Sequence, residues 1–374
     1  MNLQNPLRIC HLTSVHGRYD TRIFMKECRS LVMEGHDVSL VVADGLGDEE
    51  KDGVKIYDIG KPKNRIVRIL HSTKKVNKKA IDVNSSIYHF HDPELLFVGN
   101  SLIRKGKKVV FDIHENVGEQ IMIKEWLPYP FRKVISWIYN KIESNICRKL
   151  SALIVPQPIM VSKFLAYNSN TFLVENFPFF KGDSFNSDKT KRIEKTICFH
   201  PGSLMEDRGL INMITTFEHL DSSYELHLAG AIQDEMLERC KKLKGWEKTI
   251  FHGEIHFNEV LDLYKKTTIG LILYNNVGQY YLSYAVKLFE YMSYGIPVIM
   301  PNFGEWVGFN EENECGINID PKDSKGIAKA IAFLNDNPDK AAVMGKNGYN
   351  AIVNKYNWDN SFSRLTKCYQ TIEI

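Results

Sequence analysis

Short apolar runs alternate with longer amphipathic stretches at the start of the chain. Residues 7–12 and 36–42 are apolar runs of strand length. The stretch 22–34 between them has helical spacing and ends at Gly35, which predicts a helix. A strand, a helix and a second strand in this order predict a parallel sheet.

The same alternation begins again in the second half. Residues 287–292 predict a helix that ends at Gly295, and 297–300 predict a buried strand directly after it. A terminal helix is predicted at 358–372. The other apolar runs of strand length are residues 196–202, 224–230, 249–255, 269–274 and 315–321. Both halves therefore predict an α/β fold.

A polar, turn-rich stretch separates the two patterns. A chain of 374 residues is too long for one ordinary core and suits two domains. We expect a first domain at 1–180, completed by the terminal helix at about 358–374, and a second domain at 196–357. Residues 181–195 are the expected linker.

Composition is that of a globular protein, with 44% hydrophobic and 25% charged residues. There is no apolar run of eighteen residues and no apolar signal-peptide core at the start, so we expect a cytoplasmic protein. The seven cysteines are scattered without a C-x-x-C pair, which favours reduced, buried thiols.

Positive charge is concentrated in one segment. Residues 61–108 contain twelve Lys and Arg against three acidic residues, a net charge of +9. A solvated lysine-rich surface is one interpretation, and an anionic partner is the other. Apolar Ile66, Ile69 and Leu70 are interleaved with Arg65 and Arg68. No nucleic-acid motif accompanies them, so we favour an anionic membrane surface over nucleic acid.

Cofactor chemistry has little support. The first loop has one glycine, Gly17, so a dinucleotide-binding fingerprint is absent. His89, His91 and Asp92 are metal ligands by type. However, the two histidines alternate along an extended segment, and no further ligand has convincing spacing. No D-x-D triplet occurs, so neither a cofactor nor an essential metal is expected.

Polar residues follow two apolar runs of the first half, at 87–94 and 109–115. In open parallel sheets, ligands bind beyond the carboxyl ends of the strands. His114 comes directly after such a run and could hydrogen-bond a sugar hydroxyl or a developing charge. The alternative is a loop histidine that packs between domains.

Lys287 and Glu290 are three residues apart at the start of a predicted helix and share one face. A cation, a carboxylate and the free N–H groups of a helix start suit a ligand with both phosphate and sugar hydroxyls. The alternative is an exposed ion pair without a ligand.

Several of these segments resemble the retaining glycosyltransferase family 4, which has the GT-B fold. The resemblance covers nearly the whole chain. It is most specific at 202–209 and 283–298, and the segments 20–24, 91–95 and 112–115 resemble bacterial members that build surface polysaccharide. It implies two facing Rossmann-like domains with parallel sheets, and a C-terminal helix that crosses back to the first domain.

The resemblance also implies roles for residues. Arg208 and Lys287 would neutralise the diphosphate of a nucleotide sugar, and Glu290 would bind the ribose. His114 would lie near the transferred sugar. The implied donor-binding set is Gly202, Ser203, Arg208, Gly230, His252, Gly253, Ile255, Lys287, Leu288 and Glu290. The implied acceptor-side set is His16, Arg18, Asp20, His91 and Glu115.

The chain departs from the family pattern at two positions. Ser203 replaces an arginine of the phosphate loop, and Leu282 replaces the glutamate that contacts the donor sugar. The resemblance implies a metal-independent hexosyltransferase that uses a UDP- or GDP-type sugar. Its acceptor would be a glycan, such as a polyprenyl-linked intermediate of O-antigen or capsule, at the inner face of the cell membrane. The alternatives are a sugar-nucleotide epimerase or hydrolase of this fold, and a non-catalytic partner subunit.

Overall fold

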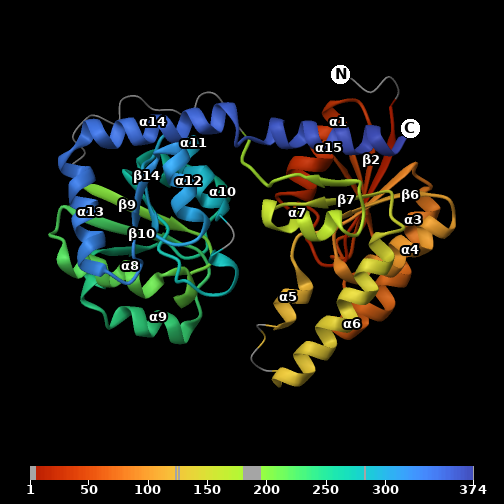
Figure 1. The fold of residues 1–374 in the computed structure, drawn as a ribbon, viewed down its shortest axis with the longest axis horizontal. Helices are drawn as coiled ribbons and strands as arrows, with labels where there is room; N and C mark the ends of the chain where they lie inside the picture. Colours follow the sequence, from red (N-terminus) through yellow and green to blue (C-terminus); the bar gives the residue numbers. More distant parts are fainter. Residues whose placement is uncertain (1–5, 123, 125–126, 180–194, 282–283, 374) are drawn as a thin grey trace. The chain divides into compact units, whose positions relative to one another are not determined.

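The computed structural model describes residues 6–122, 124, 127–179, 195–281 and 284–373 (Figure 1). The chain divides into two compact units. Unit 1 comprises Met1–Asn176 and Trp358–Ile374, and unit 2 comprises Phe177–Asn357. The predicted linker at 181–195 lies outside the described residues except for its last position.

Unit 1 is built on an eight-stranded sheet in the order β3-β4-β2-β1-β5-β6-β7-β8. All neighbouring strands are parallel except β3 and β4. The strands are β1 (Arg8–Leu12), β2 (Asp37–Val42), β3 (Glu49–Lys51), β4 (Val54–Asp58), β5 (Ile87–Phe90), β6 (Lys108–Asp112), β7 (Ala152–Val155) and β8 (Thr171–Leu173).

Helices cover both faces of this sheet, because its strands are apolar on both sides. They are η1 (Ile23–Cys28), α1 (Arg29–Met33), α2 (Arg65–Val67), η2 (Arg68–Ser72), α3 (Thr73–Val83), η3 (Pro93–Leu95), α4 (Leu96–Arg104), α5 (Val117–Met122), α6 (Tyr129–Cys147), α7 (Pro158–Leu165) and α15 (Trp358–Glu373). The terminal helix α15 lies against unit 1 (Figure 1). Its Trp358, Leu365 and Tyr369 pack into the apolar cluster that also contains residues of β1 and β2.

The helix predicted at 22–34 is present in two parts. The π-helical segment η1 comes first and carries Glu27, which is fully buried. The α-helix α1 follows and ends before Gly35, whose φ of +87° is a left-handed conformation that glycine adopts without strain.

Unit 2 has a six-stranded sheet with all pairs parallel, in the order β11-β10-β9-β12-β13-β14. Its strands are β9 (Thr196–Pro201), β10 (Tyr224–Ala229), β11 (Thr249–Phe251), β12 (Ile269–Leu271), β13 (Val298–Pro301) and β14 (Gly316–Ile319). Two apolar clusters fill its interior.

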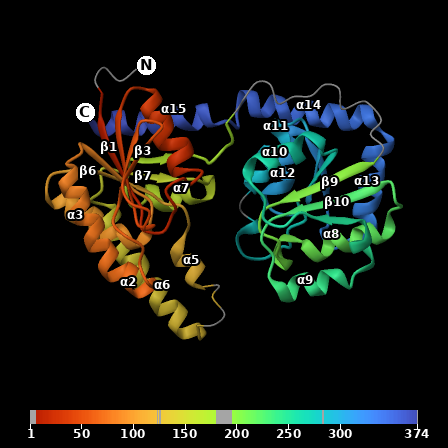
Figure 2. The same ribbon diagram turned by 180° about the vertical axis from the view of Figure 1, so that it is seen from behind.

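The helices of unit 2 connect these strands, as Figure 2 shows from behind. They are η6 (Glu206–Arg208), α8 (Leu210–Thr216), η7 (Phe217–His219), α9 (Asp234–Lys241), η8 (Lys244–Lys248), α10 (Phe257–Lys266), η9 (Gly278–Tyr281), α11 (Val286–Ser293), α12 (Glu305–Asn313), α13 (Ser324–Asp336) and α14 (Pro338–Asn354). Both units are Rossmann-like, so the α/β prediction with two parallel sheets is confirmed.

The helix α6 packs on the core of unit 1 along only part of its length. Its apolar positions predict a helix packed on a core, and Ile142 and Ile146 do pack there. Toward its start, Val134, Ile135 and Ile138 are exposed instead. In Figures 1 and 2 this first part of α6 extends past the sheet of unit 1.

Within the described residues, no helix combines the length and the apolar character needed to cross a bilayer.

Candidate functional site

Two glycines with positive φ follow the carboxyl ends of β9 and β10 in unit 2. Gly202 has a φ of +103° and Gly230 a φ of +146°. A Cβ atom at Gly230 would lie 2.0 Å from the carbonyl oxygen of Gly202. Side chains are therefore excluded at Gly230, and the backbone at this edge is open to a ligand.

Lys287 lies beside this backbone, because α11 begins directly before it. Its Nζ is 3.5 Å from the position that a Cβ of Gly202 would take. The side chain is buried, and Nζ donates to Nε2 of His200 over 2.8 Å. His200 is oriented in turn, since its Nδ1 donates to the carbonyl oxygen of Leu271 over 2.8 Å. The ammonium thus has a neutral partner.

Arg208 brings a second cation to the same place. It ends η6, and its Nε donates to the hydroxyl of Tyr280 over 3.3 Å. The guanidinium of Arg208 and Nζ of Lys287 lie 5.9 and 5.5 Å from the ring centre of Tyr274. Burial, and then the charge of Arg208, lower the pKa of Lys287 well below its usual range. Neither cation forms an ion pair with a described carboxylate.

Glu290 is half-buried on the next turn of α11. Its carboxylate accepts a short hydrogen bond from the hydroxyl of Tyr264, which is fully buried. Lys287 and Glu290 therefore bind different partners, and the interpretation as an exposed ion pair is wrong. Two buried or half-buried groups of opposite charge are held apart on one helix.

The other predicted donor residues have varied environments. Gly253 accepts from the backbone N–H of Gly230 over 2.7 Å, so these two loops are joined. Nε2 of His252 lies 3.0 Å from Nδ1 of His227. Ser203 is exposed and Ile255 half-buried, whereas Leu288 packs in the core. Leu282 lies outside the described residues.

In unit 1, two histidines and a carboxylate meet at the carboxyl ends of β5 and β6. Oδ2 of Asp112 lies 3.2 Å from Nε2 of His114 and 3.3 Å from Nδ1 of His91. Arg22 neutralises Asp112 with two hydrogen bonds of 2.8 and 3.0 Å. The structure shows that a buried carboxylate holds one ring nitrogen of His114. Contact with a substrate and packing between domains both stay predictions for this residue.

His16 lies close by, with its ring centre 4.9 Å from that of His114. Nδ1 of His16 is 3.0 Å from Oδ1 of the buried Asp92. Asp92 also accepts from the hydroxyl of Thr13 and the backbone N–H of Ser14. Burial opposes ionisation of Asp92, but the hydrogen bond from His16 and the backbone donors outweigh it and lower its pKa to about 2. Asp92 therefore anchors the loop that carries His16.

The remaining predicted acceptor-side residues contact other groups. Arg18 binds Asp44 and Glu49 over 2.7 Å each, and it fixes the first loop to β3. Asp20 accepts from the backbone N–H groups that begin η1. Glu115 is exposed and accepts from Gln120. Of the predicted acceptor-side set, the structure brings His16 and His91 next to His114, and the acceptor-side role of all five residues stays a prediction.

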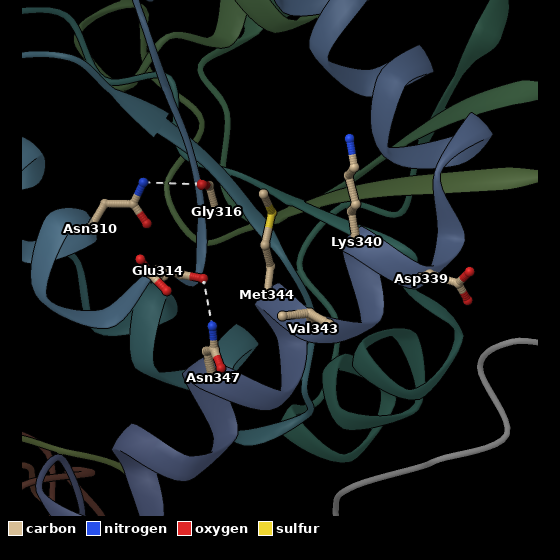
Figure 3. A pocket seen from close by; sticks show the side chains of 8 residues that line it. All are labelled: Asn310, Glu314, Gly316, Asp339, Lys340, Val343, Met344 and Asn347. Carbon is tan, nitrogen blue, oxygen red and sulfur yellow. Dashed lines mark hydrogen bonds between the residues drawn. The ribbon is translucent and has the colours of Figure 1, made fainter.

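A hollow of about 510 Å³ lies between α12, β14 and α14 (Figure 3). Asn310 donates to the carbonyl oxygen of Gly316 over 3.0 Å, and Asn347 to that of Glu314 over 3.3 Å. These groups therefore satisfy one another. The hollow also lies at the amino end of β14, whereas the glycines and cations described above lie at carboxyl ends. We assign it no role.

Two family models match the chain. "Glycosyltransferase Family 4" matches residues 21–174, and "Glycosyl transferases group 1" matches residues 183–351. Together they span most of both units. The chain therefore belongs to the glycosyltransferases of GT-B type, with a family 4 domain followed by a group 1 domain. Among curated proteins, no sequence matches it.

Solved structures share the fold over the whole chain. Sucrose-phosphate synthase from Thermosynechococcus elongatus aligns with a TM-score of 0.74 and 14% identity, over 98% of this chain and 99% of that one. HepE from Anabaena, solved with UDP and glucose, gives 0.73 and 13% over 98% and 100%. WaaG, a glycosyltransferase involved in lipopolysaccharide biosynthesis, gives 0.70 and 13% over 98% and 99%.

Sequence reasoning missed the partners that hold the predicted residues. His200, Tyr264 and Tyr274 are buried or nearly so, and each contacts a predicted donor residue. His200 and Tyr274 each stand at or just after the end of an apolar strand. A polar residue at the carboxyl end of a parallel strand was the available signal for both.

Proposed function

We propose that this protein transfers a hexose from a nucleoside-diphosphate sugar, of UDP or GDP type, to a glycan acceptor, with retention of configuration and without a metal. The observation that carries the proposal is the pairing of Lys287 and Arg208. They are two cations over one tyrosine ring, beside exposed glycine backbone at the start of α11, with no described carboxylate as partner. A diphosphate supplies the missing negative charge.

The chemical step uses those cations for the leaving group. The acceptor hydroxyl attacks C1 of the sugar on the face that the diphosphate leaves. A C–O bond to the acceptor forms, the C–O bond to phosphate breaks, and the departing phosphate takes the hydroxyl proton. Lys287 and Arg208 stabilise the charge that develops on the diphosphate. Glu290, already a hydrogen-bond acceptor, binds a ribose hydroxyl.

His114 serves the sugar or acceptor side in this proposal. Asp112 holds its Nε2, which leaves the other ring nitrogen for a substrate hydroxyl. The support is geometric: the side chain is partly exposed, while the carboxylate that orients it is fully buried.

We further propose a lipid-linked acceptor of the O-antigen or capsule type, reached from an anionic membrane surface at the inner face of the cell membrane. Trp137 and Phe131 on α6 are 66% and 61% exposed, and Ile66 and Leu70 of the basic segment are also exposed. Apolar side chains next to lysine and arginine are typical of surfaces that enter lipid headgroups.

Vesicle sedimentation tests the membrane step. The double variant Phe131→Ser and Trp137→Ser should reduce binding to phosphatidylglycerol-containing vesicles about tenfold or more, because two large apolar side chains no longer enter the bilayer. Phe97→Ser is the matched control, since Phe97 on α4 is also 66% exposed. Equal binding by all three proteins would contradict a role for α6.

A nucleotide panel tests the donor proposal. Thermal unfolding is measured with UDP, GDP, ADP and dTDP and their sugars, on wild type and Arg208→Ala. A true donor raises the midpoint because it binds only the folded state. We expect one nucleotide to respond, and the response to be lost in the variant. A flat panel at millimolar ligand would favour the non-catalytic subunit, and consumption of the sugar nucleotide without acceptor would favour the epimerase or hydrolase.

A further inference from the structure

Four fully buried side chains of unit 1 converge on one another: His11 on β1, Glu27 on η1, His89 on β5 and His91 directly after it. One ligand-type atom of each lies within 4.8 Å of all the others. A group of three imidazoles and one carboxylate in a fully enclosed space has the composition of a protein metal site.

The distances among three of these atoms fit an ion. Nδ1 of His11 lies 3.0 Å from Nε2 of His91, and Oε2 of Glu27 lies 3.7 and 3.9 Å from these two nitrogens. A point equidistant from three atoms so spaced is about 2.1 Å from each, which is the usual length of Zn–N and Zn–O bonds. For His89, Nδ1 lies against the hydroxyl of Tyr369, which leaves Nε2 as the fourth donor atom.

These atoms are otherwise poorly satisfied. Among the described residues, Nε2 of His89 and Oε2 of Glu27 have no hydrogen-bond partner, although both are fully buried. Buried polar atoms without partners are costly and call for an explanation, of which a bound ion is one.

A supporting set of contacts orients three of the four side chains. Nδ1 of His89 lies 2.7 Å from the hydroxyl of Tyr369 on α15. Nδ1 of His91 faces Asp112, and Oε1 of Glu27 faces Nε of Arg22 over 3.1 Å. Polar partners on the far ring nitrogen of His89 and of His91 direct these two ligands, as they do in metal sites generally, whereas Nε2 of His11 has no hydrogen-bond partner among the described residues.

We propose that unit 1 contains a structural site for a divalent transition metal, preferably Zn²⁺, formed by His11, Glu27, His89 and His91. All four ligands are enclosed, so the ion has no open position for substrate and serves stability rather than transfer. It ties β1, η1 and β5 together and, through Tyr369, the terminal helix α15. The sequence alone did not predict this site, because His89 and His91 lack the spacing of a local metal motif and the other two ligands lie about sixty to eighty residues earlier.

Metal content of the purified full chain tests the proposal. We expect close to one zinc ion per chain after incubation with Zn²⁺ and removal of free metal. Glu27→Gln and His89→Gln keep the shapes of the side chains but remove a ligand, and each should weaken binding by roughly a hundredfold or more. His71→Gln removes an exposed histidine of η2 in the same unit and should change nothing.

Two further readouts make the result decisive. Co²⁺ in place of Zn²⁺ should give the visible absorption of a tetrahedral site in wild type, even if a variant fails to fold. Chelation should lower the thermal midpoint of wild type but not of His89→Gln. Less than about a tenth of an equivalent of metal in wild type, or equal retention by both ligand variants, would overturn the proposal in favour of a metal-free hydrogen-bonded cluster.

Discussion

The polar centres of the two units differ in whether their buried charge has a partner of opposite charge. In unit 1, the buried carboxylate Asp112 is surrounded by Arg22, His91 and His114, so its charge is already paired. In unit 2, the buried cation Lys287 contacts a neutral histidine and lies beside another cation. A paired charge stabilises the fold by itself, whereas an unpaired one is kept at a cost and is stabilised by a ligand of opposite charge. The first centre can therefore keep its shape without a ligand, whereas the second has the positive charge that the proposed diphosphate would neutralise.

The largest difference should appear in activity. Lys287→Met preserves the length of the side chain but removes its charge, so we expect transfer to fall about a hundred- to a thousandfold in kcat/KM. The unfolding free energy without ligand should stay the same or rise, because an unpaired buried charge is lost. Lys241→Met on the exposed part of α9 is the control. If Lys287→Met instead loses stability and keeps its activity, Lys287 stabilises the fold and does not act in transfer.

The opposite pattern is expected in unit 1. Asp112→Asn leaves Arg22 without its closest carboxylate, and we expect it to lower the unfolding free energy by about 3 kcal/mol. Urea unfolding of the variant measures this, with Asp82→Asn on exposed α3 as the control. If both variants lower the free energy of unfolding by the same small amount, the network around Asp112 does not stabilise the fold.

Acid should weaken unit 1 through Asp92. Its pKa is about 2 in the folded protein against an ordinary value of 3.8. A depressed pKa contributes stability above the ordinary value and loses it as the pH falls through the folded one. The loss between pH 4 and pH 2 should be about 2 kcal/mol larger in wild type than in Asp92→Asn. Parallel acid profiles for the two proteins would show that His16 and the loop donors do not stabilise the carboxylate.

The smallest effect concerns protons taken up on binding. Lys287 has a lowered pKa in the free protein, and a bound diphosphate raises it again. Between these two values binding takes up protons, so nucleotide affinity should fall as the pH rises. Calorimetry in two buffers of different ionisation enthalpy measures the uptake, which should be absent in Lys287→Met. Uptake that persists in the variant would assign the proton to another group.

Much of the secondary structure could be predicted from local signals in the sequence. The end of α11 at Gly295 and the strand directly after it follow from helix-stop chemistry and an apolar run, which are properties of neighbouring residues. The position of Gly202 before Arg208 likewise matches the family pattern of a phosphate loop, and its binding of phosphate stays a prediction. Such features are predictable because the cause and the effect lie within one short segment.

Contacts between distant segments were not predictable in this way. Arg22 meets Asp112 ninety positions later, and His11 meets His91 eighty positions later, only because β1, β5 and β6 are adjacent in the sheet. The start of α6 shows the converse case, since its apolar side chains have helical spacing whether a core or solvent lies beneath them. Spacing fixes which residues share a face, and tertiary structure decides what that face meets.

The most direct test of the central claim compares a nucleoside diphosphate with its monophosphate. For the nucleotide that responds in the thermal panel, calorimetry gives the two affinities in wild type, Lys287→Met and Arg208→Ala. If the two cations hold the diphosphate, wild type should prefer the diphosphate by about tenfold or more, and each variant should lose most of that preference while its affinity for the monophosphate changes less. An equal preference in wild type and both variants would contradict the assignment of this cation pair to the diphosphate.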